Sequence, residues 1–151
     1  MKAEYPNATI HNFILDNFTH TLGLNLESLE PKKAWSYDGS DQGENWAYIF
    51  RYPGAMTVLE LSLHWPGEHV FVTFTNGAQW FSFNDYLGYI GKKNELDDIF
   101  ARRKTNKEHL YAENAAIEVL QLFLKYLLSD LLKVARGEEW KVIPIDWTGV
   151  K

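Results

Sequence analysis

The stretch from Trp46 to Phe83 constrains the fold most, because turn dipeptides divide it into runs of alternating apolar and polar residues. The dipeptides are Pro53-Gly54, Pro66-Gly67 and Asn76-Gly77. Turn dipeptides between alternating runs are typical of β-hairpins. The pattern therefore predicts four consecutive antiparallel strands, in which each strand pairs with the next one along the chain.

The turns also predict which residues face one another across the sheet. Each loop is expected to hold an even number of residues, because a slip of one residue moves every side chain of a strand to the other face. The expected pairs are Thr73–Trp80, Leu61–Val72 and Tyr48–Leu59. One face, called here the apolar face, then comprises Trp46, Tyr48, Phe50, Leu59, Leu61, Leu63, Val70, Val72, Phe74, Phe81 and Phe83.

The opposite face, called here the outer face, is mixed in character. It comprises Ala47, Ile49, Arg51, Val58, Glu60, Ser62, His64, His69, Phe71, Thr73, Thr75, Trp80 and Ser82. Antiparallel sheets commonly leave one face in water, which here exposes the aromatic residues Phe71 and Trp80. Two hypotheses follow: a partner binds this face, or one of the segments 86–100 and 139–147 folds over it and buries Trp80.

Helical periodicity appears before and after the predicted strands. Residues 8–22 space their apolar residues as an amphipathic helix does, and Gly23 follows the last turn. A capping-box pattern at residues 105–108 begins a long helix that is expected to end at Gly137. Asn84-Asp85 is expected to cap a shorter helix.

Two further stretches are expected to be strands. Residues 34–37 could add a fifth strand to the sheet, and the tail at residues 140–147 predicts an edge strand because it contains Pro144. The sequence thus predicts a single α+β domain over residues 1–151. Its four- to five-stranded antiparallel meander is packed on one face by an N-terminal helix and a long C-terminal helix.

Composition excludes several functional classes. The aromatic content of 15% indicates a folded domain, and the net charge of −5 argues against general binding to nucleic acid. The absence of cysteine excludes disulfides, thiolate zinc sites and a cysteine nucleophile, and it fits a reducing compartment. The N-terminus lacks the apolar core of a signal peptide, and Gln121 and Lys125 interrupt the longest apolar run. We expect a cytoplasmic protein that does not bind a membrane.

His64 and His69 form the most suggestive group of possible metal ligands. The predicted register pairs them across two strands, with Glu68 in the turn and Glu60 on the same strand as His64. Two imidazoles and a carboxylate can bind zinc. Two surface histidines that flank a turn are the simpler interpretation, since metal sites usually present more ligands. We therefore expect no metal and no cofactor.

Two further patterns, one of calcium binding and one of serine catalysis, lack a residue or context that the function requires. Residues 38–44 resemble the start of a calcium loop, but Ile49 stands where the bidentate glutamate belongs. Ser62 and His64 point the same way on one predicted strand, but Ser62 lacks the Gly-x-Ser-x-Gly context of a serine hydrolase. The sequence therefore favours a protein that is not an enzyme.

Two functional hypotheses remain. The first is a non-catalytic protein-binding module whose partner is a protein, for example a basic toxin domain, or a second copy of the chain. Small, acidic, cysteine-free cytosolic binding proteins include bacterial toxin-neutralising immunity proteins, and this analogy is one of composition only. Candidate binding residues are Phe71, Trp80, Glu60, His64 and His69. The second is a small-ligand-binding or enzymatic α+β cup with a pocket between sheet and helices, lined by Trp46, Tyr48, Tyr86 and Tyr89.

We predict that His64 and His69 hold no structural metal. Removal of divalent metals with a chelator should leave the Tm unchanged, because a metal bound only by the folded state would stabilise that state by mass action. Thermal unfolding with and without chelator measures this. A fall in Tm that the His64→Ala variant abolishes would contradict the prediction.

Overall fold

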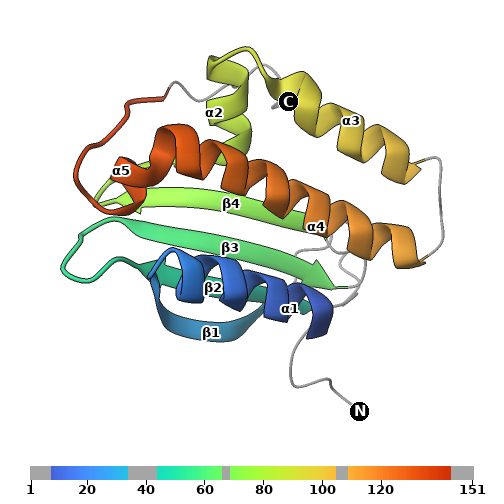
Figure 1. Ribbon diagram of the computed structural model, residues 1–151, viewed down its shortest axis with the longest axis horizontal. Coiled ribbons are helices and arrows are strands. Elements are labelled where there is room, and N and C mark those ends of the chain that lie inside the picture. Colours follow the sequence, from blue (N-terminus) through green and yellow to red (C-terminus); the bar gives the residue numbers. More distant parts are fainter. Residues whose placement is uncertain (1–7, 34–43, 66–68, 105–108, 144–151) are drawn as a thin grey trace.

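The computed structural model describes residues 8–33, 44–65, 69–104 and 109–143 (Figure 1). The strands are β1 (Asn25–Lys33), β2 (Glu44–Arg51), β3 (Val58–Trp65), β4 (His69–Asn76) and β5 (Gln79–Ser82). The helices are α1 (Ala8–Ile14), α2 (Phe83–Tyr89), α3 (Lys93–Lys104), α4 (His109–Tyr126) and α5 (Leu132–Ala135). Two π-helical segments, η1 (Leu15–Thr21) and η2 (Leu127–Leu131), continue α1 and α4 respectively.

The five strands form one antiparallel sheet in sequence order, which confirms the predicted meander and the α+β class. The fifth strand of the sheet is β1, which precedes residues 34–37, where sequence analysis expected a fifth strand. Residues 34–37 themselves lie outside the described part of the structure. The pairing of β1 with β2 shifts between Leu26 and Ser28. Such a bulge bends the strand locally, and here it lies on an edge strand of the sheet.

The predicted register is correct for the turn between β3 and β4. It is wrong by two residues for the turn between β2 and β3 and for the turn between β4 and β5. Leu61 faces Val72 as expected, but Tyr48 also faces Leu61 rather than Leu59. Trp80 faces Thr75 rather than Thr73. A shift of two residues preserves the side of the sheet on which each side chain lies, so the assignment of the faces survives these errors.

The physical reason for the last error is the turn between β4 and β5. Asn76 is the final residue of β4 and pairs with Gln79, so Gly77 and Ala78 are the two loop residues. Gly77 has a φ of 61°. Glycine at the first loop position suits a type II′ turn, whereas the sequence prediction took Asn76-Gly77 as the loop.

All members of the apolar face are buried. They pack under α1, η1 and α4, which lie across the same face of the sheet (Figure 1). Phe123 of α4 is central to this core: its ring lies 5.9 Å from Phe18 of η1, 5.9 Å from Phe74 of β4 and 5.1 Å from Phe83 of α2, measured between centroids. Such aromatic contacts stabilise a core beyond the effect of the buried area alone.

Ser82 ends β5 and begins α2. Its hydroxyl accepts a hydrogen bond from the Asp85 backbone N–H at 3.1 Å, and the Asp85 carboxylate accepts one from the Ser82 backbone N–H, also at 3.1 Å. This reciprocal capping box replaces the expected cap at Asn84-Asp85. As a result β5 is only four residues long.

The C-terminal helical region ends at Ala135, and Gly137, the expected stop, follows in the turn after it. Gly137 has a φ of 75°, and a Cβ added there would lie 2.9 Å from Cβ of Ala55 in the loop between β2 and β3. Residues 140–143 of the predicted edge strand are not in a strand, and residues 144–147 lie outside the described part. The segment instead packs Trp140 against Phe81, with ring centroids 5.2 Å apart.

We predict that Leu61→Asp unfolds the domain. Leu61 is fully buried at the centre of the apolar face. An unpaired buried carboxylate costs several kcal/mol, comparable with the total stability of about 5–15 kcal/mol. Chemical denaturation checks this, with Thr75→Asp on the half-buried outer face as the matched control, which should cost about 1 kcal/mol or less. Equal losses in the two variants would contradict the assignment of the faces.

Candidate functional site

The outer face presents two large aromatic side chains to solvent. Phe71 of β4 is 56% exposed and Trp80 of β5 is 46% exposed. The described helices contribute to the core on the opposite face, so none of them covers these side chains. Segment 86–100, where described, forms parts of α2 and α3, and it does not bury Trp80.

The observed register separates the two aromatic residues. Trp80 lies opposite Thr75, which is four residues along β4 from Phe71. At about 3.3 Å per residue, their levels differ by about 13 Å along the strand. The expected Thr73–Trp80 pair would have made them diagonal neighbours. Phe71 and Trp80 are therefore two separate exposed anchors on one face rather than a single stacked pair.

On the side of Phe71 away from β5, the outer face continues over β3 and β2 with smaller and partly polar side chains. Glu60 is half-buried, and its carboxylate accepts a hydrogen bond from the Ser62 hydroxyl at 3.1 Å. Ile49 and Val58 are also half-buried. Arg51 lies at the end of this face, and its Nε is 2.9 Å from the Glu27 carboxylate. Exposed aromatic side chains beside polar groups are common at protein interfaces.

His64 and His69 are opposite each other across β3 and β4, as the sequence predicted. Their side chains and Glu68 lie outside the described part of the structure. Among the side chains that the structure does describe, no three from His, Asp and Glu converge as metal ligands.

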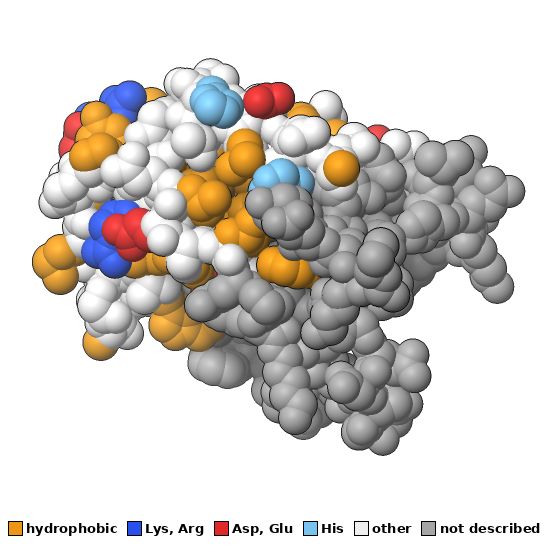
Figure 2. All heavy atoms as spheres, turned by 90° about the horizontal axis from the view of Figure 1, so that it is seen from below, with side chains coloured by type: hydrophobic (Ala, Val, Ile, Leu, Met, Phe, Trp, Pro, Cys, Tyr) orange, Lys and Arg blue, Asp and Glu red, His pale blue; other side chains and the backbone are white. Residues whose placement is uncertain are grey.

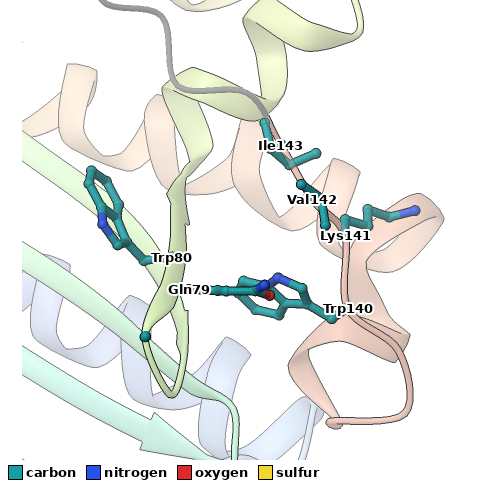
Figure 3. A pocket seen from close by; sticks show the side chains of 7 residues that line it. Gln79, Trp80, Trp140, Lys141, Val142 and Ile143 are labelled. Carbon is teal, nitrogen blue, oxygen red and sulfur yellow. The ribbon is translucent and has the colours of Figure 1, made fainter.

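A cleft of about 210 Å³ lies beside β5 (Figure 3). It is lined by Ala78, Gln79, Trp80, Trp140, Lys141, Val142 and Ile143. Gln79 points toward Trp140, whereas Trp80 projects from the other side of the strand. The cleft thus lies on the Gln79 side of β5, and its far wall is part of the segment that sequence analysis expected to be a strand.

The four aromatic residues of the cup hypothesis occupy different environments. Trp46, Tyr48 and Tyr86 are buried in the core, whereas Tyr89 is 62% exposed. None of them lines the cleft beside β5.

Two buried tyrosines join helices through carboxylates. Tyr86 of α2 donates a hydrogen bond to Asp130 at 2.6 Å, and Tyr126 of α4 donates one to Glu95 of α3 at 2.7 Å. Burial, followed by the hydrogen bond to Asp130, raises the pKa of Tyr86 far above its ordinary value. Burial and the bond to Glu95 raise the pKa of Tyr126 to about 12. Both hydroxyls therefore stay protonated at neutral pH, and they act as donors that tie helices together rather than as bases.

A third polar contact lies on the apolar face. His11 Nδ1 of α1 is 2.8 Å from the hydroxyl of Tyr48, and Tyr48 is fully buried. Burial lowers the pKa of His11. Sequence reasoning missed this contact and both tyrosine–carboxylate pairs, because each joins residues distant in sequence and leaves no local pattern.

On the side on which β1 lies, the side chains that the structure describes show no concentration of one charge. Seen from below, hydrophobic side chains reach the surface near its middle, and the charged side chains around them are dispersed (Figure 2). Leu26 and Leu29 of β1 are half-buried and pack against the core. Among the helices in the described ranges, none is long and apolar enough to cross a membrane.

The geometry defines an α+β domain with its helices on one face of a meander and two aromatic anchors on the other. No protein family, curated protein or solved structure matches the chain. Function is therefore inferred from the side chains themselves.

We predict that acid destabilises the domain through His11. Because the folded-state pKa is lowered, the unfolded chain binds more protons once the pH falls below the ordinary histidine pKa of about 6.5. The stabilisation is therefore complete above that pH and is lost as the pH falls through the folded-state pKa. Denaturation between about pH 7.5 and 5.5 measures the slope.

The matched controls are two asparagine variants. His11→Asn keeps an amide near the position of Nδ1 and should flatten the pH dependence, whereas His20→Asn on the exposed side of η1 should not. An unchanged slope in His11→Asn would contradict the prediction.

Proposed function

We propose that the protein is a non-catalytic protein-binding domain whose partner contacts the outer face at Phe71 and Trp80. The observation that carries this proposal is the exposure of these two aromatic side chains, 56% and 46%, on the side of the sheet opposite the described helices. Large exposed aromatic residues grouped on one surface often mark interfaces, and tryptophan is enriched among the residues that dominate binding energy.

Burial of the two anchors would contribute a substantial free energy of binding. Each side chain leaves on the order of 100 Å² in water, and burial of that area contributes about 2–3 kcal/mol at about 25 cal/mol per Å². Polar groups of β3 beside Phe71, such as Ser62, can form the hydrogen bonds that set orientation.

The size of the face limits the kind of interface. Strands of eight residues and five strands give a sheet of roughly 26 by 19 Å, or about 500 Å² in projection. A standard interface buries about 800 Å² on each partner. The partner is therefore expected to extend past the sheet onto its edges.

Charge favours a basic partner. The chain has a net charge of −5, and Glu60 lies on the outer face, on the strand next to that of Phe71. Complementary charge mainly increases the association rate and the specificity. An immunity protein that masks a basic toxin domain is one functional class that fits these properties. A second copy of this chain is the alternative partner.

We predict that Trp80→Ala and Phe71→Ala each weaken partner binding at least tenfold while folding stability falls by about 1 kcal/mol or less. The partner is obtained by affinity capture from the cells that produce the chain, is purified, and is then titrated against each variant by calorimetry. Analytical ultracentrifugation of the chain alone tests self-association.

The matched control is Tyr89→Ala, because Tyr89 is equally exposed but lies on α2. An equal loss of affinity in this control would contradict the location of the interface. So would a loss of about 3–5 kcal/mol of stability in Trp80→Ala without a binding defect, which is the cost of a cavity left by a buried residue.

A further inference from the structure

One edge of β5 carries a backbone position that the sheet does not use. Asn76 and Gln79 close a two-residue loop, so they form a hydrogen-bonded pair in the antiparallel ladder. The next pair, Thr75 and Trp80, is then non-hydrogen-bonded. The N–H and C=O of Trp80 therefore point away from β4, and within the described part of the chain no other backbone group bonds to them.

The next backbone N–H of β5 that points away from β4, that of Ser82, already has a hydrogen-bond acceptor. The backbone N–H of Ser82 donates to Asp85 Oδ2 at 3.1 Å, within the capping box. The edge of β5 thus offers a single donor and a single acceptor, both at Trp80. An unpaired strand edge of this kind is a template for an added strand.

The cleft runs along this same edge. Its volume of about 210 Å³ exceeds the about 150 Å³ of an apolar cavity that accepts benzene, so it can hold one aromatic or large aliphatic side chain. Its walls include apolar side chains from Ala78, Trp140, Val142 and Ile143. A backbone edge beside a pocket for one side chain is the arrangement used in recognition by strand addition.

We propose that an extended segment of the partner protein adds to β5 and inserts one large apolar side chain into the cleft. Its backbone bonds to the N–H and C=O of Trp80. This inference rests on the proposed function and extends the partner's contact from the outer face onto the sheet edge, through a residue that borders both.

The walls of the cleft specify the occupant further. Segment 140–143 lies across the cleft from β5 (Figure 3), so an added segment has protein on both sides of it. The lining includes one cation, Lys141, and no carboxylate. Lys141 Nζ is 3.6 Å from the Glu139 carboxylate, a half-exposed pair that solvent screens. The inserted segment therefore has an acidic residue next to its apolar side chain.

The test uses the full chain and a defined probe. The probe is a short acetylated and amidated peptide of alternating threonine and valine, with a central phenylalanine preceded by aspartate. In an amide NMR titration, the N–H of Trp80 should shift downfield as it gains an acceptor, together with shifts at Gln79, Val142 and the Trp140 indole. Replacing the phenylalanine by alanine should weaken binding at least tenfold, and replacing the aspartate by lysine should weaken it about threefold or more.

Two exposed positions provide matched variants that leave the core intact. Val142 is 78% exposed and lines the cleft, whereas Leu128 is 58% exposed on η2 and does not. Val142→Trp fills the cleft and should abolish peptide binding, and Leu128→Trp should leave it unchanged. Equal affinity in the two variants, or equal affinity of the phenylalanine and alanine peptides, overturns the proposal.

The outer-face variant separates this inference from the proposed function. Phe71→Ala should not change peptide affinity, because Phe71 does not line the cleft. If the peptide binds and Phe71→Ala keeps its full affinity for the partner, the interface on the outer face is refuted. The proposal of an added strand at β5 then still stands. Self-association that Val142→Trp abolishes would show that the edge pairs with a second copy, and it would overturn the assignment of a partner segment.

Discussion

The contact between the apolar face and Phe123 of α4 is the interaction on which the rest of the structure depends. The ring of Phe123 touches aromatic side chains from η1, the sheet and α2, so one residue joins the three parts of the core. A sheet with one fully apolar face is unstable alone in water, since burial of that face is its main driving force. Every described helix packs on this face, so none of them covers the opposite one.

Much of the fold could be predicted because the relevant signal is local. Alternation with a period of two assigns Phe50, Leu63 and Phe74 to one face without knowledge of their partners. Partner identity depends on where each loop begins, which the sequence indicates weakly. The structure closes the last hairpin at Asn76–Gln79 and places Gly77 inside the loop, so Trp80 moves by two residues relative to β4. The alternation of apolar and polar residues cannot reveal such an error, because a shift of two residues leaves every side chain on the same face.

The candidate surface was predicted only in part for the same reason. Exposure of Phe71 and Trp80 follows from alternation, but their separation and the unpaired backbone groups of Trp80 follow from the position of the loop. The polar contacts connect distant residues: Tyr86 and Asp130 are 44 positions apart, and His11 and Tyr48 are 37 apart. No local spacing rule finds such pairs. The wall formed by Trp140 was also missed, since the tail was expected to be a strand.

The position of Gly137 against Ala55 bears on how the chain is made. The strands are complete by Ser82, yet part of their apolar face is covered by α4, which follows far behind, and the chain meets the loop between β2 and β3 again only at Gly137. During synthesis from the N-terminus, the sheet therefore emerges together with α1 and η1 but before the cover that α4 provides. Chains that expose apolar surface in this interval are prone to aggregate. The domain is accordingly expected to complete its folding after translation has passed Gly137, and to need protection by chaperones until then.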